Sequence, residues 1–219
     1  MTGKRGAIFD WDGVIINSAP HHERSWERLA EEQKRTLPAG HFKRGFGMKN
    51  EFIIPELLGW TTDVAEIRTL SLRKEALYRE IVREIGIAPL PGVKTWLTRL
   101  RDAGIPCVIG SSTHRENITV TLEVLGLADF FAAAVTSEDV KRGKPDPEVF
   151  LTAGQRIGVG PGEGVVFEDA LVGIAAGKAA GMTVVGVTTT NPRELLKDAD
   201  IVVDRLDELT IEQLWPVES

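Results

Sequence analysis

The sequence is poor in cysteine: Cys107 is the only one among 219 residues. A single thiol cannot form a disulfide within the chain, and a chain without a disulfide framework is typical of a reducing compartment. Cys107 lies in the apolar run that extends from Ile105 to Ile109. We therefore expect a buried thiol that does not react.

The sequence also lacks long apolar runs, internal repeats and an excess of positive charge. No apolar run approaches the length of a membrane-spanning helix, and the first residues lack the apolar stretch of a signal peptide. The formal net charge of −6 disfavours a general nucleic-acid or anionic-membrane surface. We expect a soluble cytoplasmic protein, a monomer or weak homodimer, with no nucleic-acid or membrane partner.

Short apolar runs that end at small or acidic residues recur along the chain, and helical patterns separate the later ones. The predicted strands are Ala7–Phe9, Cys107–Gly110, Ala132–Val135, Val165–Phe167, Val184–Val187 and Ile201–Val203. The predicted helices are Val93–Ala103, Glu116–Leu125, Pro147–Ile157, Leu171–Ala180 and Arg193–Ala199. This alternation predicts an α/β fold, a Rossmann-like parallel sheet with helices on both faces.

The segment between Ile16 and the turn at Leu90 contains no convincing strand. The predicted helices there are His21–Gln33, Ala39–Gly45, Asn50–Leu58 and Asp63–Ile85. A helical block inserted after the first strand would stand over the carboxyl end of that strand. We expect residues 1–17 and 88–219 to form an α/β catalytic core domain and residues 18–87 an inserted all-helical cap domain.

The last helix of the insert carries an apolar stripe at the helical period. The stripe consists of Ile67, Leu70, Leu77, Ile81 and Ile85, with Lys74 at its centre. Either Lys74 extends to water along the stripe, or the stripe faces a cleft that holds an anion. His22 shares a face of the first insert helix with Trp26 and Leu29, where a histidine is more often a core residue than a catalytic one.

Two carboxylates near the amino terminus, Asp10 and Asp12, follow the first predicted strand. In an open α/β sheet, ligands collect at the carboxyl ends of the strands. Carboxylates are costly in an apolar core unless they bind something, and their hard oxygens suit Mg²⁺ together with substrate phosphate oxygens. An ordinary turn would also explain Asp12-Gly13, so the choice depends on partners further along the chain.

Three further groups follow predicted strands. Glu168 and Asp169 form a second acidic pair at the sheet edge that carries Asp10, which favours a metal site over a helix cap. The Ser111-Ser112-Thr113 run precedes a helix, where hydroxyl and N–H groups can cap the helix and bind an anion. Lys144 precedes a proline, and a fixed cation among carboxylates allows a phosphate dianion to bind.

The motifs, in chain order, are Asp10-Trp11-Asp12-Gly13-Val14, Ser111 after an apolar strand, Lys144-Pro145, and Glu168-Asp169 with Gly173 beyond. In this order and spacing they resemble the haloacid dehalogenase superfamily of phosphohydrolases, and the resemblance covers essentially the whole chain. The helical insert is similar to the superfamily's alpha-helical cap of the first type. The pattern of His22 and Trp26 at the cap entry is similar to the branch of beta-phosphoglucomutase and related sugar phosphatases.

The resemblance implies a role for each motif. Asp10 would attack phosphorus and form an aspartyl-phosphate, and Asp12 would act as general acid and base. Mg²⁺ would be held by Asp10, the backbone carbonyl of Asp12, and Asp169, with Glu168 assisting directly or through water. The implied catalytic residues are Asp10, Asp12, Ser111 and Lys144; the implied metal ligands are Asp10, Asp12, Glu168 and Asp169; and the substrate-binding candidates are His22, Lys49, Lys74, Ser112 and Arg115.

Two positions depart from the family pattern. Many relatives carry an aspartate where this chain has Asn17 at the cap entry. The mutase grips a second phosphate with a cap arginine, and Asn50 in the Gly47-Met48-Lys49-Asn50 stretch aligns with it. An asparagine has no charge for this task, although Lys49 or Arg115 could replace the arginine.

We therefore expect a Mg²⁺-dependent phosphatase that hydrolyses a small phosphorylated metabolite, a sugar phosphate, through an aspartyl-phosphate. Phosphoryl transfer between sugar hydroxyls, as in beta-phosphoglucomutase, is the alternative. A non-enzymatic phospho-aspartate signalling domain is disfavoured by the cap insertion and by Asp12. Lys144 is followed by a proline, so Gly143-Lys144 is not a P-loop.

Overall fold

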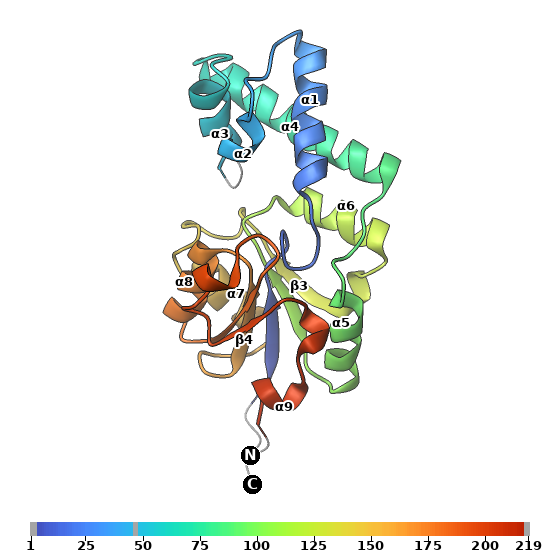
Figure 1. Cartoon of the computed structure of the whole chain (residues 1–219), viewed down its shortest axis with the longest axis vertical. Coiled ribbons are helices and arrows are strands. Elements are labelled where there is room, and N and C mark those ends of the chain that lie inside the picture. Colours follow the sequence, from blue (N-terminus) through green and yellow to red (C-terminus); the bar gives the residue numbers. More distant parts are fainter. Residues whose placement is uncertain (1–3, 46–47, 217–219) are drawn as a thin grey trace. The chain divides into compact units, whose positions relative to one another are not determined.

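The computed structural model describes residues 4–45 and 48–216. Contacts between Cα atoms divide the chain into two compact units. We call Ser18–Gly86 the helical unit, and Met1–Asn17 together with Ile87–Ser219 the sheet unit. Figure 1 shows the helices of the first and the layered arrangement of the second.

The sheet unit contains one sheet, in which the described residues form six parallel strands in the order β3-β2-β1-β4-β5-β6. The strands are β1 (Gly6–Phe9), β2 (Cys107–Gly110), β3 (Phe131–Val135), β4 (Gly164–Glu168), β5 (Thr183–Val187) and β6 (Ile201–Val203). The chain adds strands to one side of β1, then crosses back and adds the rest to the other side. The sequence-based prediction of a Rossmann-like parallel sheet is confirmed.

Helices cover both faces of the sheet because the side chains of each strand alternate between two apolar clusters. Ala7 and Phe9 belong to one cluster, whereas Ile8 between them belongs to the other. The first cluster includes residues of α5 (Val93–Asp102), α6 (Arg115–Leu125) and α9 (Ile211–Leu214). The second includes residues of α7 (Glu148–Arg156) and α8 (Leu171–Ala179).

One predicted helix of the sheet unit is wrong. Residues 193–199 form only the short 3-10 turn η3 (Arg193–Leu195) in place of an α-helix. Leu196 is the buried residue of this segment and belongs to the second cluster, while Lys197 and Asp198 are exposed. A single buried position does not provide the apolar stripe that stabilises a surface helix, so the chain turns directly into β6.

The helical unit contains α1 (Ala19–Gln33), α2 (His41–Gly45), α3 (Asn50–Phe52) and α4 (Val64–Ile85). The helix predicted over Asn50–Leu58 is divided, because α3 passes into the π-helical turn η1 (Ile53–Leu57). Pro55 lies inside this turn and has no N–H to donate, which disfavours a regular α-helix there. The apolar core of the unit joins α1 to α4 through Trp26, Leu29, Leu70 and Leu77.

Cys107 lies in the apolar cluster on one face of the sheet. Cys107 is buried in β2, as expected, and burial raises the pKa of its thiol to about 12, which disfavours the reactive thiolate. Within residues 4–45 and 48–216, each helix is too short or too polar to cross a lipid bilayer.

The two chain segments that lead out of and back into the sheet unit lie beside each other. Ile16 forms an isolated antiparallel bridge with Pro89, and the N–H of Leu90 donates to the carbonyl of Ile15 at 2.8 Å. The N–H of Gly13 donates to the carbonyl of Ile16 at 2.8 Å and closes the loop that follows β1. The insertion therefore begins and ends at one point of the sheet unit.

Phe167 provides a test of the sheet core. Its ring is fully buried and stacks on Phe9 with 4.4 Å between ring centroids. We expect Phe167→Ala to lower the free energy of unfolding by about 3–5 kcal/mol, because it leaves a cavity between two layers. Val172→Ala, at a position that is 52% exposed, is the control and should change it by less than about 0.5 kcal/mol. Equal losses in the two variants, measured by urea denaturation, would contradict this description of the core.

Candidate active site

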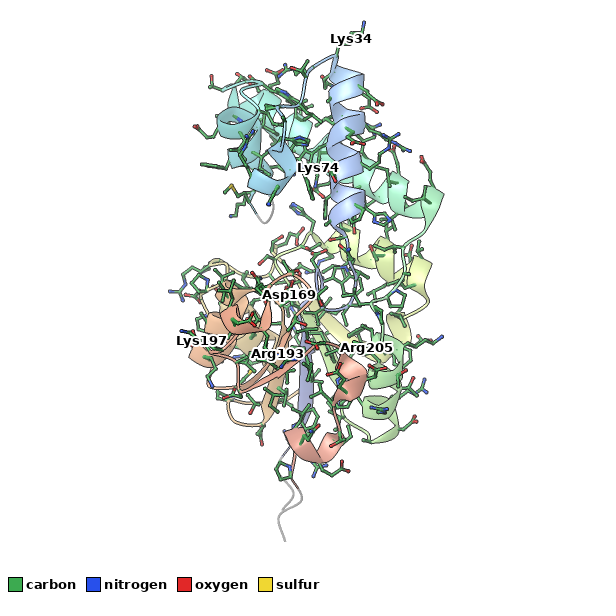
Figure 2. All side chains as sticks on the ribbon, in the orientation of Figure 1. Lys34, Lys74, Asp169, Arg193, Lys197 and Arg205 are labelled. Atoms are coloured by element: carbon green, nitrogen blue, oxygen red, sulfur yellow. The ribbon has the colours of Figure 1, made fainter. Side chains whose placement is uncertain are left out.

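Carboxylates from two neighbouring strands meet at the carboxyl edge of the sheet. Asp10 follows β1 directly, Glu168 is the last residue of β4, and Asp169 comes next. Phe9 pairs with Phe167 in the parallel ladder, and the N–H of Asp10 continues it by donating to the carbonyl of Phe167 at 3.0 Å. Carboxylate oxygens of Asp10, Glu168 and Asp169, which is labelled in Figure 2, lie within 4.8 Å of one another.

The ammonium group of Lys144 lies between two of these carboxylates. Its Nζ is 3.0 Å from Oδ1 of Asp10 and 2.6 Å from Oε1 of Glu168, and its side chain is 7% exposed. Burial disfavours a charged lysine, but the charges of Asp10 and Glu168 outweigh burial and raise the pKa of Lys144. Lys144 is therefore a fixed cation at the edge of the sheet.

The two carboxylates of β4 are in different environments. Burial raises the pKa of Glu168, against the opposing effect of Lys144. One oxygen of Glu168 accepts from Lys144, and the other accepts from the N–H groups of Asp169 at 2.8 Å and Ala170 at 2.9 Å. Burial, followed by the charges of Glu168 and Asp10, raises the pKa of Asp169 to about 8. Both oxygens of Glu168 are thus engaged within the protein, whereas the charged form of Asp169 is disfavoured by its neighbours.

These residues fit a divalent cation. Within the described residues, Oδ1 of Asp10 is buried and has no hydrogen bond of good geometry, although the ammonium group of Lys144 lies at ion-pair distance. Buried carboxylates that repel one another, with an oxygen left over, are the donor set that a hard cation such as Mg²⁺ prefers. Asp10 and Asp169 are the best placed ligands, because the oxygens of Glu168 already have partners.

Two glycines allow the carboxylates to approach the backbone. Gly13 has a φ of +80°, and a Cβ at this position would lie 1.9 Å from Oδ2 of Asp169. A Cβ at Gly173, in the first turn of α8, would lie 1.7 Å from Oε1 of Glu168. Any side chain at either position would therefore displace a carboxylate of the site.

The loop after β2 brings hydroxyl groups to the same edge. Ser111 is buried, its N–H donates to the carbonyl of Val135 at 3.0 Å, and its Oγ accepts from the N–H of Thr113 at 3.2 Å. The hydroxyl of Thr113 donates to a carboxylate oxygen of Asp12. Ser112 is exposed. The structure thus brings Asp12 and Ser111 to one end of the sheet with Asp10, Lys144, Glu168 and Asp169.

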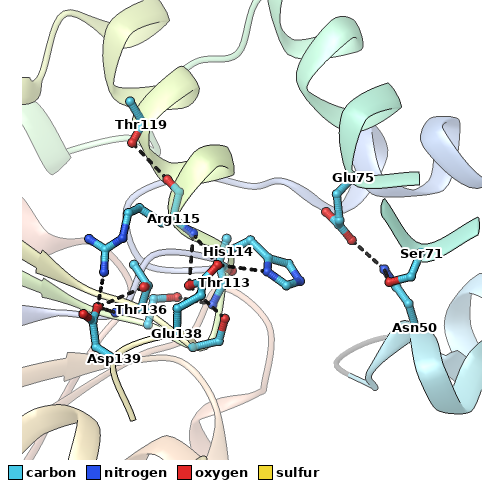
Figure 3. A network of polar contacts seen from close by, with 12 residues as sticks. Asn50, Ser71, Glu75, Thr113, His114, Arg115, Thr119, Thr136, Glu138 and Asp139 are labelled. Atoms are coloured by element: carbon cyan, nitrogen blue, oxygen red, sulfur yellow. Dashed lines mark hydrogen bonds and ion pairs between the residues drawn. The ribbon is translucent and has the colours of Figure 1, made fainter. Parts of the chain in front are cut away.

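Arg115, a substrate-binding candidate, begins α6 and has partners within the sheet unit. Its guanidinium donates to Asp139 at 2.5 Å, and its backbone N–H lies 3.3 Å from each carboxylate oxygen of Glu138 (Figure 3). Glu138 therefore already accepts from the N–H of Arg115, the first residue of α6.

The candidates His22 and Lys74 of the helical unit contact each other. The Nζ of Lys74 donates to Nδ1 of His22 at 2.7 Å, which places the ring proton of a neutral His22 on Nε2, and to Oε1 of Glu75 at 3.0 Å. Lys74, labelled in Figure 2, is buried and lies 5.5 Å from the centre of the Trp26 ring. The His22 ring stacks on Tyr78 at 4.1 Å. Lys74 therefore does not extend to water, and Ile85 of the expected stripe is itself 69% exposed.

The remaining candidates lie around α3. Asn50 is buried, and its Nδ2 donates to Ser71 at 3.1 Å and to Glu75 at 2.7 Å, as Figure 3 shows. Lys49 precedes α3 and is exposed. Gly47 lies outside the described residues. Asn50, which we expected at the position of the mutase's arginine, is thus a neutral residue that donates to a buried carboxylate.

Sequence reasoning assigned no role to two polar residues after β5. The side chain of Asn191 donates to the carbonyl of Asp169 at 3.0 Å. A hydrogen bond from Thr190 offsets part of the rise that burial causes in the pKa of Asp169. The run of threonines that follows β5 at the functional edge of the sheet was the signal for this contact.

The site has the composition that the sequence motifs indicated, and comparison with known proteins identifies the class. The model of the haloacid dehalogenase-like hydrolases matches residues 4–181. The chain therefore belongs to the haloacid dehalogenase-like hydrolase family.

Among the relatives are enzymes named as phosphatases. The chain is 37% identical over 212 residues to the chloroplastic 5-amino-6-(5-phospho-D-ribitylamino)uracil phosphatase of Arabidopsis thaliana, a match that covers 95% of this chain and 56% of the plant protein. The chain thus spans little more than half the length of that relative. It is 32% identical over 213 residues to hexitol phosphatase A of Escherichia coli, with 94% of each protein covered. The family and these relatives support phosphoric monoester hydrolysis as the activity of the chain.

The structure is also similar to that of a mutase. A crystal structure of beta-phosphoglucomutase from Clostridium difficile superimposes with a TM-score of 0.80 at 28% identity, covering 96% of this chain and 95% of the other. The similar proteins therefore include both a phosphatase and a mutase, the two enzyme types considered from the sequence.

Gly173→Ala tests the close approach of α8 to Glu168. The added Cβ must displace the carboxylate of Glu168, which is an ion-pair partner of Lys144. We expect phosphate-ester hydrolysis to fall by about a hundredfold, since small displacements of catalytic groups have effects of this size. The matched control is Gly160→Ala, where the nearest atom to the new Cβ is at 3.6 Å and the rate should stay at that of the parent. A Gly173→Ala enzyme with the activity of the parent would show that Glu168 does not need its observed position.

Proposed function

We propose that the chain is a Mg²⁺-dependent phosphatase that hydrolyses a small phosphorylated metabolite through an aspartyl-phosphate on Asp10. The observation that carries the proposal is the carboxylate of Asp10, buried at the end of the central strand beside Lys144 and in reach of Asp169. We further propose that the sheet unit is the catalytic core domain and the helical unit its cap.

The cation would be held by Asp10, Asp169 and the backbone carbonyl of Asp12, with Glu168 acting through water. When bound, Mg²⁺ supplies positive charge to the oxygens of the transferring phosphoryl group. Lys144 adds a second positive charge at 3.0 Å from Asp10, and the hydroxyl of Ser111 adds a hydrogen-bond donor. Together these groups would bind a phosphate dianion in a site that otherwise contains mostly carboxylates.

The residues of the site support a reaction in two steps. A carboxylate oxygen of Asp10 attacks phosphorus, the bond from phosphorus to the ester oxygen breaks, and Asp12 gives its proton to the leaving alkoxide. Asp12 then takes a proton from water, which attacks phosphorus and releases phosphate from Asp10. Thr113, whose hydroxyl contacts Asp12, would keep that carboxyl group oriented in both steps.

The substrate class that we propose is a sugar phosphate or a similar polyol phosphate. Similarity to a relative named as a hexitol phosphatase supports this class. Because the formal net charge of the chain is −6, the phosphate group must be bound by local cations such as Lys144. His22, Lys49, Lys74 and Ser112 stay candidates for contacts to the leaving group. The cytoplasmic location and the monomer or weak homodimer stay predictions.

The pairing of Asn50 favours hydrolysis over mutase chemistry. A mutase must hold the second phosphate of a bisphosphate while the sugar turns round. Asn50 is neutral, and its amide already donates to the buried carboxylate of Glu75. That carboxylate also accepts from Lys74 at 3.0 Å, so the positive charge of Lys74 is matched by a negative charge beside it.

Asp10→Asn tests the proposed nucleophile. The amide has the shape of the carboxylate but cannot attack phosphorus, so we expect a folded protein without measurable phosphate release. Phosphate release from a panel of phosphorylated metabolites with Mg²⁺ is the measurement, and chelator added to the parent should abolish it. Hydrolysis by Asp10→Asn at the rate of the parent would exclude Asp10 as the nucleophile, and full activity in chelator would exclude the metal.

The products formed from beta-glucose 1-phosphate separate the two enzyme types. Because Asn50 provides no charge to hold a second phosphate, we expect free phosphate and little glucose 6-phosphate, even when the reaction is primed with the bisphosphate. Both products are followed in one reaction. If glucose 6-phosphate forms much faster than phosphate, the chain is a mutase and Lys49 is the first residue to examine as a substitute anchor.

A further inference from the structure

Two loops of the sheet unit are joined beside the candidate active site. One loop follows β2 and begins with Ser111, and the other follows β3 and leads to Lys144. Backbone bonds connect them: the N–H of Ser111 donates to Val135 at 3.0 Å, and the N–H of Ser137 donates to Thr113 at 3.4 Å. Each loop thus carries a residue of the site, Ser111 in one and Lys144 in the other, and backbone hydrogen bonds join the two loops near their first residues.

The turn after β3 presents an oriented carboxylate to Arg115. The N–H and hydroxyl of Thr136 donate to Oδ2 of Asp139 at 2.8 Å and 2.9 Å, and this same oxygen accepts from Arg115 at 2.5 Å (Figure 3). The side chain of Arg115 is 48% exposed and that of Asp139 only 16%. Asp139 is therefore a rigid acceptor to which the longer, more exposed side chain of Arg115 is fixed.

Glu138 holds the backbone of the same residue. Its carboxylate accepts from the N–H of Arg115 and lies 3.1 Å from Nδ1 of His114. Burial works against the charged form, but hydrogen bonds from Thr136, from its own backbone, from His114 and from Arg115 outweigh burial and lower the pKa of Glu138 to about 2. The first residue of α6 is thus held by two adjacent carboxylates, one on its backbone and one on its side chain.

The held residue is two positions after Thr113, whose hydroxyl donates to Asp12. A shift of Arg115 would move this hydroxyl relative to Asp12, and would move Ser111 at the other end of the same short loop. The guanidinium of Arg115, in contrast, donates to Asp139, which makes it a poor match for a substrate group.

We propose that Arg115 is a positioning residue, fixed by Asp139 and Glu138, that sets the loop carrying Ser111 and Thr113 against Asp12. This proposal rests on the proposed phosphatase function and replaces the sequence-based assignment of Arg115 to substrate binding. The clamp, as we call Arg115 with Asp139 and Glu138, acts on every substrate alike, because it contacts the protein loop and no leaving group.

The test compares Arg115→Ala, Asp139→Ala and the double variant on p-nitrophenyl phosphate. This ester has no second charge or hydroxyl that an arginine at the leaving group could recognise. We expect kcat to fall by about tenfold in each variant while KM changes by less than about threefold. The double variant should be no worse than Asp139→Ala by more than about twofold, since both lack the contact between Arg115 and Asp139. Asp139→Ala also removes the hydrogen bonds from Thr136 and the ion pair with Arg156 at 3.7 Å, so its loss can exceed that of Arg115→Ala.

Three results would overturn the proposal. They are a kcat of Arg115→Ala equal to that of the parent, a loss confined to KM, and a loss in Arg115→Ala that Asp139→Ala does not share. If the alanine variants lose thermal stability, Arg115→Lys and Asp139→Asn make the same comparison. Arg115→Lys retains the charge and should recover part of kcat, but not all, because a lysine lacks the fork of donors.

The matched control is Arg205→Ala. Arg205, labelled in Figure 2, pairs with Asp207 at 2.7 Å, and the two side chains are 54% and 23% exposed. Its removal should leave kcat unchanged. A parent enzyme that hydrolyses no phosphate ester would refute the proposed function, whereas an active parent whose kcat is insensitive to Arg115 and Asp139 would refute the clamp alone.

Discussion

The candidate site depends on the ion pairs that the ammonium group of Lys144 forms with Asp10 and Glu168. Three buried carboxylates within 4.8 Å of one another would repel strongly, and Lys144 lies against two of them. Three carboxylates and one ammonium leave a formal charge of −2 when all are ionised, which is the charge that one divalent cation neutralises. The parallel pairing of β1 with β4 and the absence of side chains at Gly13 and Gly173 all serve this close arrangement.

The sheet could be predicted because its strands are buried on both faces. A parallel strand of this kind is a short, nearly continuous apolar run, and Ala7–Phe9 and Val165–Phe167 are clear examples. The residues that follow such runs must lie at one edge of the sheet. The order of residues alone was therefore enough to place Asp10, Glu168 and the Ser111 run together.

Side-chain partners and irregular backbone could not be predicted in the same way. The direction of the Arg115 side chain depends on Asp139 in the turn after β3, and the burial of Lys74 depends on His22 of α1, which packs against α4. These choices arise from contacts between residues distant in sequence. The wrong prediction of a helix at residues 193–199 has a different cause. This segment has no apolar stripe that could stabilise a helix by packing, so only the short turn Arg193–Leu195 forms.

Because the bridge between Ile16 and Pro89 joins the two ends of the inserted segment, the length of this segment can vary during evolution. The entropy lost on closing a loop grows only with the logarithm of its length, so doubling the inserted segment costs about 0.6 kcal/mol. We therefore expect the sheet unit to tolerate inserts of very different size at this point with only a small loss of stability.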